Sequence, residues 1–181
     1  MDFVNIDKNL PNGENMGGLA QLCIFGLWED VATWPTAPVN PLDVEANGEW
    51  VGDVVMKAGK NAFTFYSTDD TSELKINPVG EQDGMSFEEE LSIFNPGLKK
   101  KLLGFISAAK NENLFFIVQD SEGQWYLLGD DKRAAHMVSG EVGTGKASAD
   151  RKGASLTFKF KTNTPRAYVG DVTTLLGESS G

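Results

Sequence analysis

The segment 140–146 is the part of this chain that most closely matches a catalytic or ligand-binding motif. Its sequence, GEVGTGK, fits the first seven positions of a phosphate-binding P-loop, in which backbone N–H groups surround phosphates and the lysine reaches them. Ala147 then stands where a P-loop has the Ser or Thr hydroxyl that binds Mg²⁺. Residues 148–153 lack the pattern of an amphipathic helix whose N-terminus could hold the anion. We therefore expect a glycine-rich loop between two strands and no nucleotide site.

Other residues suited to catalysis or metal binding are few. His136 is the single histidine and Cys23 the single cysteine, which excludes a His-rich or Cys-based zinc site. Cys23 has apolar neighbours on both sides and is expected to be a buried thiol. The run Glu88-Glu89-Glu90 places alternate carboxylates on opposite faces of a strand, which is a poor metal cage. We expect no enzyme activity, no cofactor and no metal.

A short motif points to small-ligand carriers instead. Gly48-Glu49-Trp50 resembles the Gly-x-Trp of lipocalin-like barrels, and a length of 181 residues suits that class. Lipocalins place their main helix near the C-terminus after eight strands, whereas the helix predicted here lies in the middle of the chain. A lipocalin-like ligand-binding β-barrel therefore stays an alternative.

Length and composition predict one domain, residues 1–181. A chain of this length with 40% hydrophobic residues can bury one substantial core but not two. No stretch approaches the roughly 20 consecutive apolar residues of a membrane helix. The N-terminus, MDFVN, lacks the basic and then apolar segment of a signal peptide. We expect a protein that stays in the compartment where it is made and has no membrane partner.

Most of the chain after residue 50 has the pattern of β-strands. Turn residues bound apolar or alternating runs at 19–28, 51–57, 62–66, 72–76, 85–93, 114–119, 125–129 and 154–161. Within 85–93 only Glu89 breaks the apolar face, and within 154–161 Leu156, Phe158 and Phe160 face inward. The acidic outer face of the first run could pair with the lysines of the second. The pattern predicts a mainly β fold, a β-sandwich or barrel-like pair of sheets.

One α-helix is predicted near the middle of the chain, from Asn95 to Lys110. Asn95 is a good N-cap residue, and Pro96 suits the first helical position. Apolar residues then recur at helical spacing, namely Leu98, Leu102, Phe105, Ile106 and Ala109. This helix should pack one face onto a sheet.

The two termini and a lysine cluster suggest where neighbouring subunits would meet. Residues 1–50 are expected to form a long extended arm or loop together with the first strand, and 172–181 a flexible C-terminal tail. Long loops in compact domains tend to be functional, and lysines near a helix N-terminus oppose the helix dipole. The candidate subunit interface is Trp34, Pro35, Pro38, Pro41, Lys99, Lys100 and Lys101. The alternatives are that the proline-rich segment is a surface loop without a function and that the three lysines lie on a helix face that contacts only solvent.

Charge is distributed unevenly along the chain. The net charge is -10, which argues against a surface that binds DNA or anionic membranes. Residues 1–97 hold 17 acidic residues against 4 lysines, a net of -13, whereas residues 98–181 hold 9 acidic against 12 basic residues, a net of +3. Such a division could attract a second copy head to tail, unless both halves interleave in the fold and the difference averages out.

The order and composition of four stretches resemble phage tail-tube (major tail) proteins, especially those of prophages from Bacteroidetes-type bacteria, and more distantly type VI secretion tube proteins. The stretches are Gly17-Gly18-Leu19, 30–35 (DVATWP), 115–129 (FFIVQDSEGQWYLLG) and 154–169. The resemblance implies a β-sandwich or barrel-like pair of sheets flanked by one helix. It also implies hexameric rings that stack around a channel for DNA, with no catalytic residues.

The same resemblance implies a location and a set of partners. The protein would be a virion component, made in the host bacterial cytoplasm, that binds copies of itself and other phage tail proteins. DNA would be non-specific cargo in the lumen, and an acidic wall suits this role because basic walls would hold the polymer. Other phage structural roles, a head-tail connector or a capsid decoration protein, stay open as alternatives.

Overall fold

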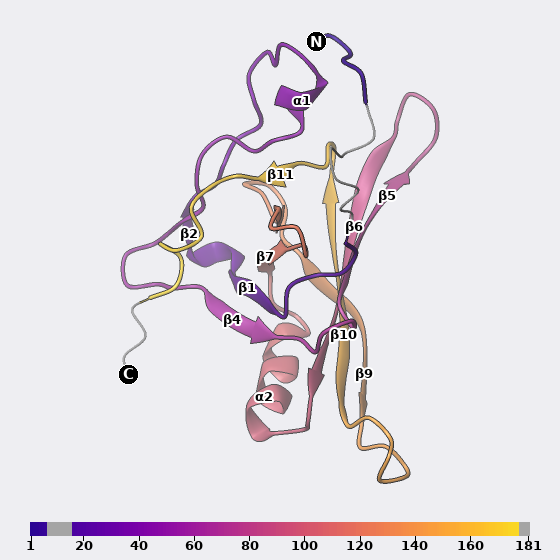
Figure 1. Cartoon of the computed structure of the whole chain (residues 1–181). Coiled ribbons are helices and arrows are strands. Elements are labelled where there is room, and N and C mark those ends of the chain that lie inside the picture. Colours follow the sequence, from indigo (N-terminus) through magenta and orange to yellow (C-terminus); the bar gives the residue numbers. More distant parts are fainter. Residues whose placement is uncertain (7–15, 178–181) are drawn as a thin grey trace.

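The computed structural model describes residues 1–6 and 16–177, and their fold is mainly β, with 43% strand and 10% helix (Figure 1). The strands are β1 Leu22–Leu27, β2 Val31–Thr33, β3 Val55–Met56, β4 Phe63–Tyr66, β5 Glu73–Val79, β6 Ser86–Pro96, β7 Leu114–Gln119, β8 Trp125–Leu128, β9 His136–Gly143, β10 Gly153–Thr162 and β11 Ala167–Tyr168. The helices are the 3-10 turn η1 Trp28–Asp30, the short α1 Val44–Asn47 and α2 Lys100–Ala109. The predicted fold class is confirmed.

Two larger sheets pack face to face. One has five strands in the order β11-β8-β7-β1-β4, and the other has four in the order β5-β6-β10-β9. A small sheet of β2 and β3 pairs with neither, and its Val31 and Met56 pack against the five-stranded sheet. The strand order is open in each sheet, so the described strands do not close into the single eight-stranded barrel of the lipocalin alternative.

The five-stranded sheet is covered on both faces, which explains the sequence of its central strand. All of β7 except its last residue is buried, and alternate side chains join different cores. Phe116 packs between the two large sheets, where its ring lies 4.5 Å from that of Phe158. Phe115 and Ile117 pack on the opposite side with Trp50, Val54 and Tyr168. A strand buried on both faces needs a continuous apolar run rather than an alternating one.

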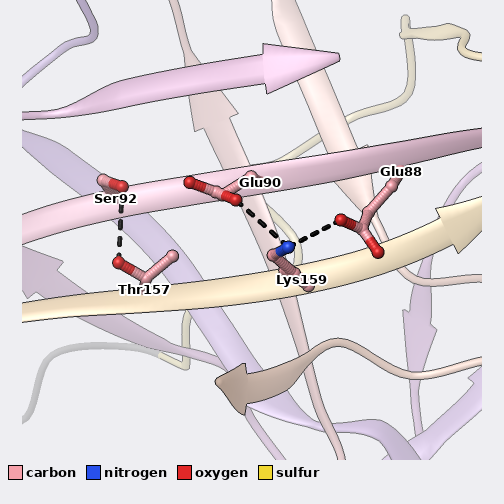
Figure 2. Close-up of polar contacts among 5 residues, drawn as sticks. All are labelled: Glu88, Glu90, Ser92, Thr157 and Lys159. Carbon is pink, nitrogen blue, oxygen red and sulfur yellow. Dashed lines mark hydrogen bonds and ion pairs between the residues drawn. The ribbon is translucent and has the colours of Figure 1, made fainter. Parts of the chain in front are cut away.

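The four-stranded sheet has one buried and one polar face. The predicted inward residues of β10, Leu156, Phe158 and Phe160, are all at most 1% exposed. Glu89 also points inward, as the alternation in β6 predicted. On the polar face Lys159 lies against Glu88 and Glu90, so the predicted cross-strand pairing of acids and lysines is confirmed (Figure 2).

The middle helix begins later than the sequence predicted. Asn95 and Pro96 belong to the end of β6, where they pair with Ala154 and Gly153. The Asn95 amide donates a hydrogen bond to the Tyr66 carbonyl oxygen, 2.7 Å away, instead of capping a helix. The N-cap residue is Lys99, without a side-chain cap. The predicted packing is right, because Leu98, Leu102, Phe105 and Ile106 contact the core between the sheets.

Three other expectations need correction. The run 51–57 forms only the two-residue β3, because Val54 turns into the core. The first strand starts at Leu22 rather than Leu19. Residues 172–177 were expected to begin a free tail, yet Leu175 is 1% exposed and its carbonyl oxygen accepts the Ala62 N–H at 2.9 Å. The rest of that predicted tail, 178–181, lies outside the described residues.

Membrane-spanning helices were searched for in the described part of the chain. None of its helices is both long and apolar enough to cross a membrane.

Candidate subunit interface

The two ends of the molecule carry opposite charge. The N-terminus, α1 and the β5–β6 turn lie at one end, and α2 and the β9–β10 turn lie at the other (Figure 1). We define the arm end as residues 1–6, 37–50 and 80–85, and the helix end as residues 97–110 and 144–152. The arm end holds six acidic side chains and no Lys or Arg, whereas the helix end holds seven Lys or Arg and one Asp. Residues outside these ranges also reach the two ends, because Arg166 donates hydrogen bonds to Asn47 in the arm end and Asp70 lines a hollow with Arg151 of the helix end. The fold therefore keeps the charge division of the sequence apart in space only in part.

The arm end also exposes large apolar side chains. Phe3, Ile6, Val39 and Leu42 are each between 84% and 91% exposed. The first residues are held against the long loop, because the Asp2 N–H donates to the Leu42 carbonyl oxygen at 3.0 Å and its carbonyl oxygen accepts the Val44 N–H at 3.1 Å. Apolar side chains this exposed, gathered on anchored backbone, mark a surface that fits contact with another molecule.

The long loop is closed at its base and presents its acidic residues outward. Thr36 and Val51 exchange two backbone hydrogen bonds of 2.9 Å, which tie the two ends of residues 37–50 together. Asp43 caps α1, because its Oδ1 accepts the Ala46 N–H at 2.9 Å. Glu45 and Glu49 are exposed. The loop thus has a defined shape and a negative surface.

The three lysines of the helix end are exposed at the start of α2. Lys99 is its N-cap, and Lys100 and Lys101 occupy the first turn, where the helix dipole disfavours cations. None of the four ion pairs found within residues 1–6 and 16–177 involves them. Their charge is therefore available to an acidic partner.

The structure separates the predicted interface residues into different environments. Trp34 is half-buried and stacks on Trp28 with ring centroids 6.1 Å apart. Pro35 is buried within its own chain, which removes it from the candidate surface. Pro38 and Pro41 are half-buried in the long loop. The prolines and the lysines lie at opposite ends of one copy, so they can meet only between two copies.

Both edges of the four-stranded sheet are open. Within the described residues β5 pairs only with β6, and β9 only with β10. Because the sheet is antiparallel and has four strands, its two edge strands run in opposite directions. Most residues of both edges are exposed. Unpaired backbone of this kind is a template for pairing with another chain.

A basic groove beside the start of β9 escaped sequence reasoning. Two adjoining hollows of about 640 and 790 Å³ share Lys132, Arg133 and Lys161. The groove walls come from the loop after β8, from β10 and from residues around Trp28 and Trp34. The groove joins residues that are far apart in the sequence, and the DDKR run at 130–133 is its one local signal.

The P-loop-like segment is only partly the predicted loop, because residues 140–143 are the end of β9 and pair with β10, and 144–146 begin the hairpin loop between the two strands. The Oδ2 atom of Asp150 accepts the N–H groups of Lys146 and Ala147, both at 2.8 Å, and these bonds hold the pKa of Asp150 below its ordinary value. A side chain of the same loop thus occupies two of the backbone donors that a phosphate would need.

A buried thiol and a buried carboxyl group have raised pKa values. Burial raises the pKa of the Cys23 thiol to about 12, as expected of an inert core cysteine. Burial likewise raises the pKa of Glu89 to about 8. Glu89 pairs with Ile76 on one side and with Phe160 on the other in the four-stranded sheet. Within the described ranges no group of three His, Cys, Asp or Glu side chains could hold a metal ion.

Comparison with known proteins found no similarity: no protein family, no curated protein and no solved structure matches this chain.

Proposed function

We propose that this chain is the subunit of a phage tail tube, in which copies form rings, hexameric by the resemblance described above, and the rings stack around a channel for DNA. The observation that carries the proposal is the opposition of an acidic, apolar arm end and a basic helix end on one elongated β body. Complementary surfaces on opposite ends make a heterologous contact, which repeats without limit along an axis. A stack of copies is the natural product.

The stacking contact needs both of its components. Exposed ion pairs contribute only about 0.2 to 1 kcal/mol each, so the lysines of the helix end alone would not hold a stack. The exposed Phe3, Val39 and Leu42 supply apolar area whose burial drives association. Charge then selects the orientation, because two arm ends or two helix ends repel each other.

The open sheet edges support lateral assembly into a ring. Rotation about an axis roughly along the strands brings β9 of one copy beside β5 of the next. These edges run in opposite directions, so their pairing extends the antiparallel sheet. Because β5 and β9 are different edges, a copy that has paired through one of them can still pair with another copy through the other. Addition of copies stops when the last β9 pairs with the first β5 and the ring closes.

The polar face of the four-stranded sheet suits the wall of a DNA channel. With the five-stranded layer on the outside of the ring, this face lines the channel. Its Lys159 is held by two carboxylates, and Ser92 and Thr157 place hydroxyl groups 3.5 Å apart beside it (Figure 2). A lysine occupied in this way is a poor phosphate ligand, which favours the sliding of DNA past this part of the wall.

Native mass spectrometry and negative-stain imaging of the purified chain test the proposal. Rings of one copy number that stack into tubes with a central channel support it. Single rings that never stack favour the connector alternative. A protein that stays monomeric at every concentration contradicts the proposal.

A further inference from the structure

The groove beside the start of β9 is basic on a chain that is acidic overall. Lys132, Arg133 and Lys161 line both of its hollows and are all exposed. The ion pairs found in residues 1–6 and 16–177 include none of the three. These cations share the two hollows with Glu88, Asp130 and Asp131, and form no ion pair within the part of the chain that the structure describes.

The backbone of the groove is fixed before any partner binds. The Oδ1 atom of Asp130 accepts the N–H groups of Lys132 and Arg133 at 2.8 and 2.7 Å. The Asp130 carbonyl oxygen accepts the indole N–H of Trp28 at 2.7 Å, which ties the loop to the body. A preorganised basic loop loses little conformational freedom on binding an acidic segment.

The β5–β6 turn is an acidic segment of matching character. Glu81 and Asp83 are exposed at its tip, which projects from the body (Figure 1). The turn is tight, because Gly80 has φ +103° and a Cβ there would lie 2.8 Å from the Gly84 carbonyl oxygen. The Gly84 N–H closes the turn on the Glu81 carbonyl oxygen at 3.0 Å. The two carboxylates are thus presented on a defined scaffold.

The strand register brings this turn to the groove of an adjacent copy. One row crosses the four-stranded sheet through Lys75, Glu90, Lys159 and His136. The chain joins this sheet only at His136, because Ala135 pairs with Leu114 of β7, so Lys161, which lines the groove with Lys132 and Arg133, marks where the groove lies. Lys161 is in one row with Glu88 and Asn77, and Asn77 is four residues before Glu81. When β5 of one copy extends the sheet beside β9 of another and the rows continue across the contact, the β5–β6 turn lies beside the groove.

We propose that the basic groove receives Glu81 and Asp83 of the adjacent copy in the ring. The inference rests on the proposed function, since it requires lateral pairing of the two sheet edges. The occupant is a second copy rather than a nucleic acid for two reasons. The register places the acidic turn at the groove, and a chain of net charge -10 repels phosphate at a distance. These contacts fix how neighbouring copies are staggered.

Two charge-reversal variants test the contact, Glu81→Lys/Asp83→Lys in the turn and Lys132→Glu/Arg133→Glu in the groove. All four side chains are exposed, and Gly80 and Asp130, which shape the two segments, are unchanged. Each variant alone should weaken ring formation by at least about tenfold in sedimentation velocity at low salt. An equimolar mixture should recover most of the loss, because each copy then meets a neighbour of opposite charge. Glu122→Lys, in the acidic turn between β7 and β8, is the matched control and should assemble like wild type.

The other outcomes overturn the inference. If wild type forms rings or tubes and Lys132→Glu/Arg133→Glu does the same, this contact is wrong while the proposed function stands, because these two residues belong to neither the arm end nor the helix end. If a short DNA duplex binds wild type and loses binding in Lys132→Glu/Arg133→Glu while assembly is unchanged, the groove is a nucleic-acid site instead. A wild type that stays monomeric throughout overturns both the inference and the proposed function.

Discussion

The ammonium group of Lys159 lies 2.6 Å from the Glu88 Oε1 atom, across the pairing of β10 with β6 (Figure 2). Glu90 approaches the same nitrogen at 3.4 Å from the next outward position of β6. The hydrogen bonds that Lys159 donates to both carboxylates raise its pKa above the ordinary value. This lysine therefore stays charged, and its charge is matched within the sheet.

Removing the two carboxylates should make the polar face bind DNA. In Glu88→Gln/Glu90→Gln the ammonium group of Lys159 is free to bind phosphate, and each lysine that does so should steepen the dependence of log K on log salt by about 0.9. Fluorescence anisotropy with a short duplex at low salt measures the effect. The triple variant that adds Lys159→Gln should lose the new binding. DNA affinity that is unchanged in the double variant would show that the two carboxylates do not mask this lysine.

Glu89 should make the protein less stable as pH rises. Its pKa is about 8 when folded, against an ordinary value of 4.5. Below about pH 4.5 the Glu89 carboxyl is protonated in both the folded and the unfolded protein. Between about pH 4.5 and pH 8 it ionises in the unfolded chain but stays protonated in the folded protein, so the free energy of unfolding falls as pH rises. Glu89→Gln lacks this penalty and should be more stable by roughly 3 kcal/mol at pH 7, and by much less near pH 5.

Urea denaturation of wild type and Glu89→Gln at about pH 5 and about pH 8 measures the contribution of Glu89 to the pH dependence of stability. The other acidic residues are the same in both proteins, so their contributions cancel in the difference. The difference in unfolding free energy between the two proteins should grow with pH. An equal difference at both pH values would mean that Glu89 ionises as freely in the folded protein as in the unfolded chain.

Leu102 should be the main anchor of α2. It is 7% exposed and packs in the core between the sheets, whereas its neighbour Leu103 is 48% exposed. Leu102→Ala should lower the free energy of unfolding by roughly 2 to 5 kcal/mol. Leu103→Ala is the matched control and should change it by less than about 0.5 kcal/mol. Similar losses for the two variants would place the exposed face of α2 in a contact that one copy does not show.

The apolar side chains of the arm end should matter for assembly and not for folding. Phe3→Ser/Leu42→Ser removes two side chains that are 91% and 84% exposed. We expect weaker stacking by native mass spectrometry and a thermal midpoint within a few degrees of wild type. Val169→Ser, an exposed position elsewhere, should alter neither property. Unchanged stacking in the double variant would remove these side chains from the contact.

Strands bounded by strong turn signals could be predicted from the sequence. The range of β7 was predicted to the residue, because Asn113 and Asp120 interrupt a continuous apolar run. The inward position of Glu89 followed from the alternation of β6 alone. The start of α2 could not be predicted, because the Asn95 amide finds a partner in Tyr66, which is distant in sequence. Local capping patterns do not report such tertiary hydrogen bonds.

The candidate interface was predictable only in part. Lys99 to Lys101 were recognised from their unfavourable place in the helix, and they are exposed. Pro35 belongs to a proline-rich segment that predicts a surface position, yet it is buried. The basic groove depends on how the loop after β8 meets β10, and the opposition of the two ends depends on strand direction. Neither relationship is contained in a linear pattern of residue types.

Charge complementation most directly tests the central claim that copies stack through oppositely charged ends. The variants are Lys99→Glu/Lys100→Glu/Lys101→Glu at the helix end, where acidic residues suit the start of a helix and should not impair folding, and Glu45→Lys/Glu49→Lys at the arm end. Sedimentation velocity is compared at low salt and at about 1 M salt, where the Debye length is about 3 Å. We predict that each variant alone stacks less than wild type at low salt, that an equimolar mixture recovers stacking, and that the differences shrink at high salt. Variants that sediment like wild type at both salt concentrations would contradict the account.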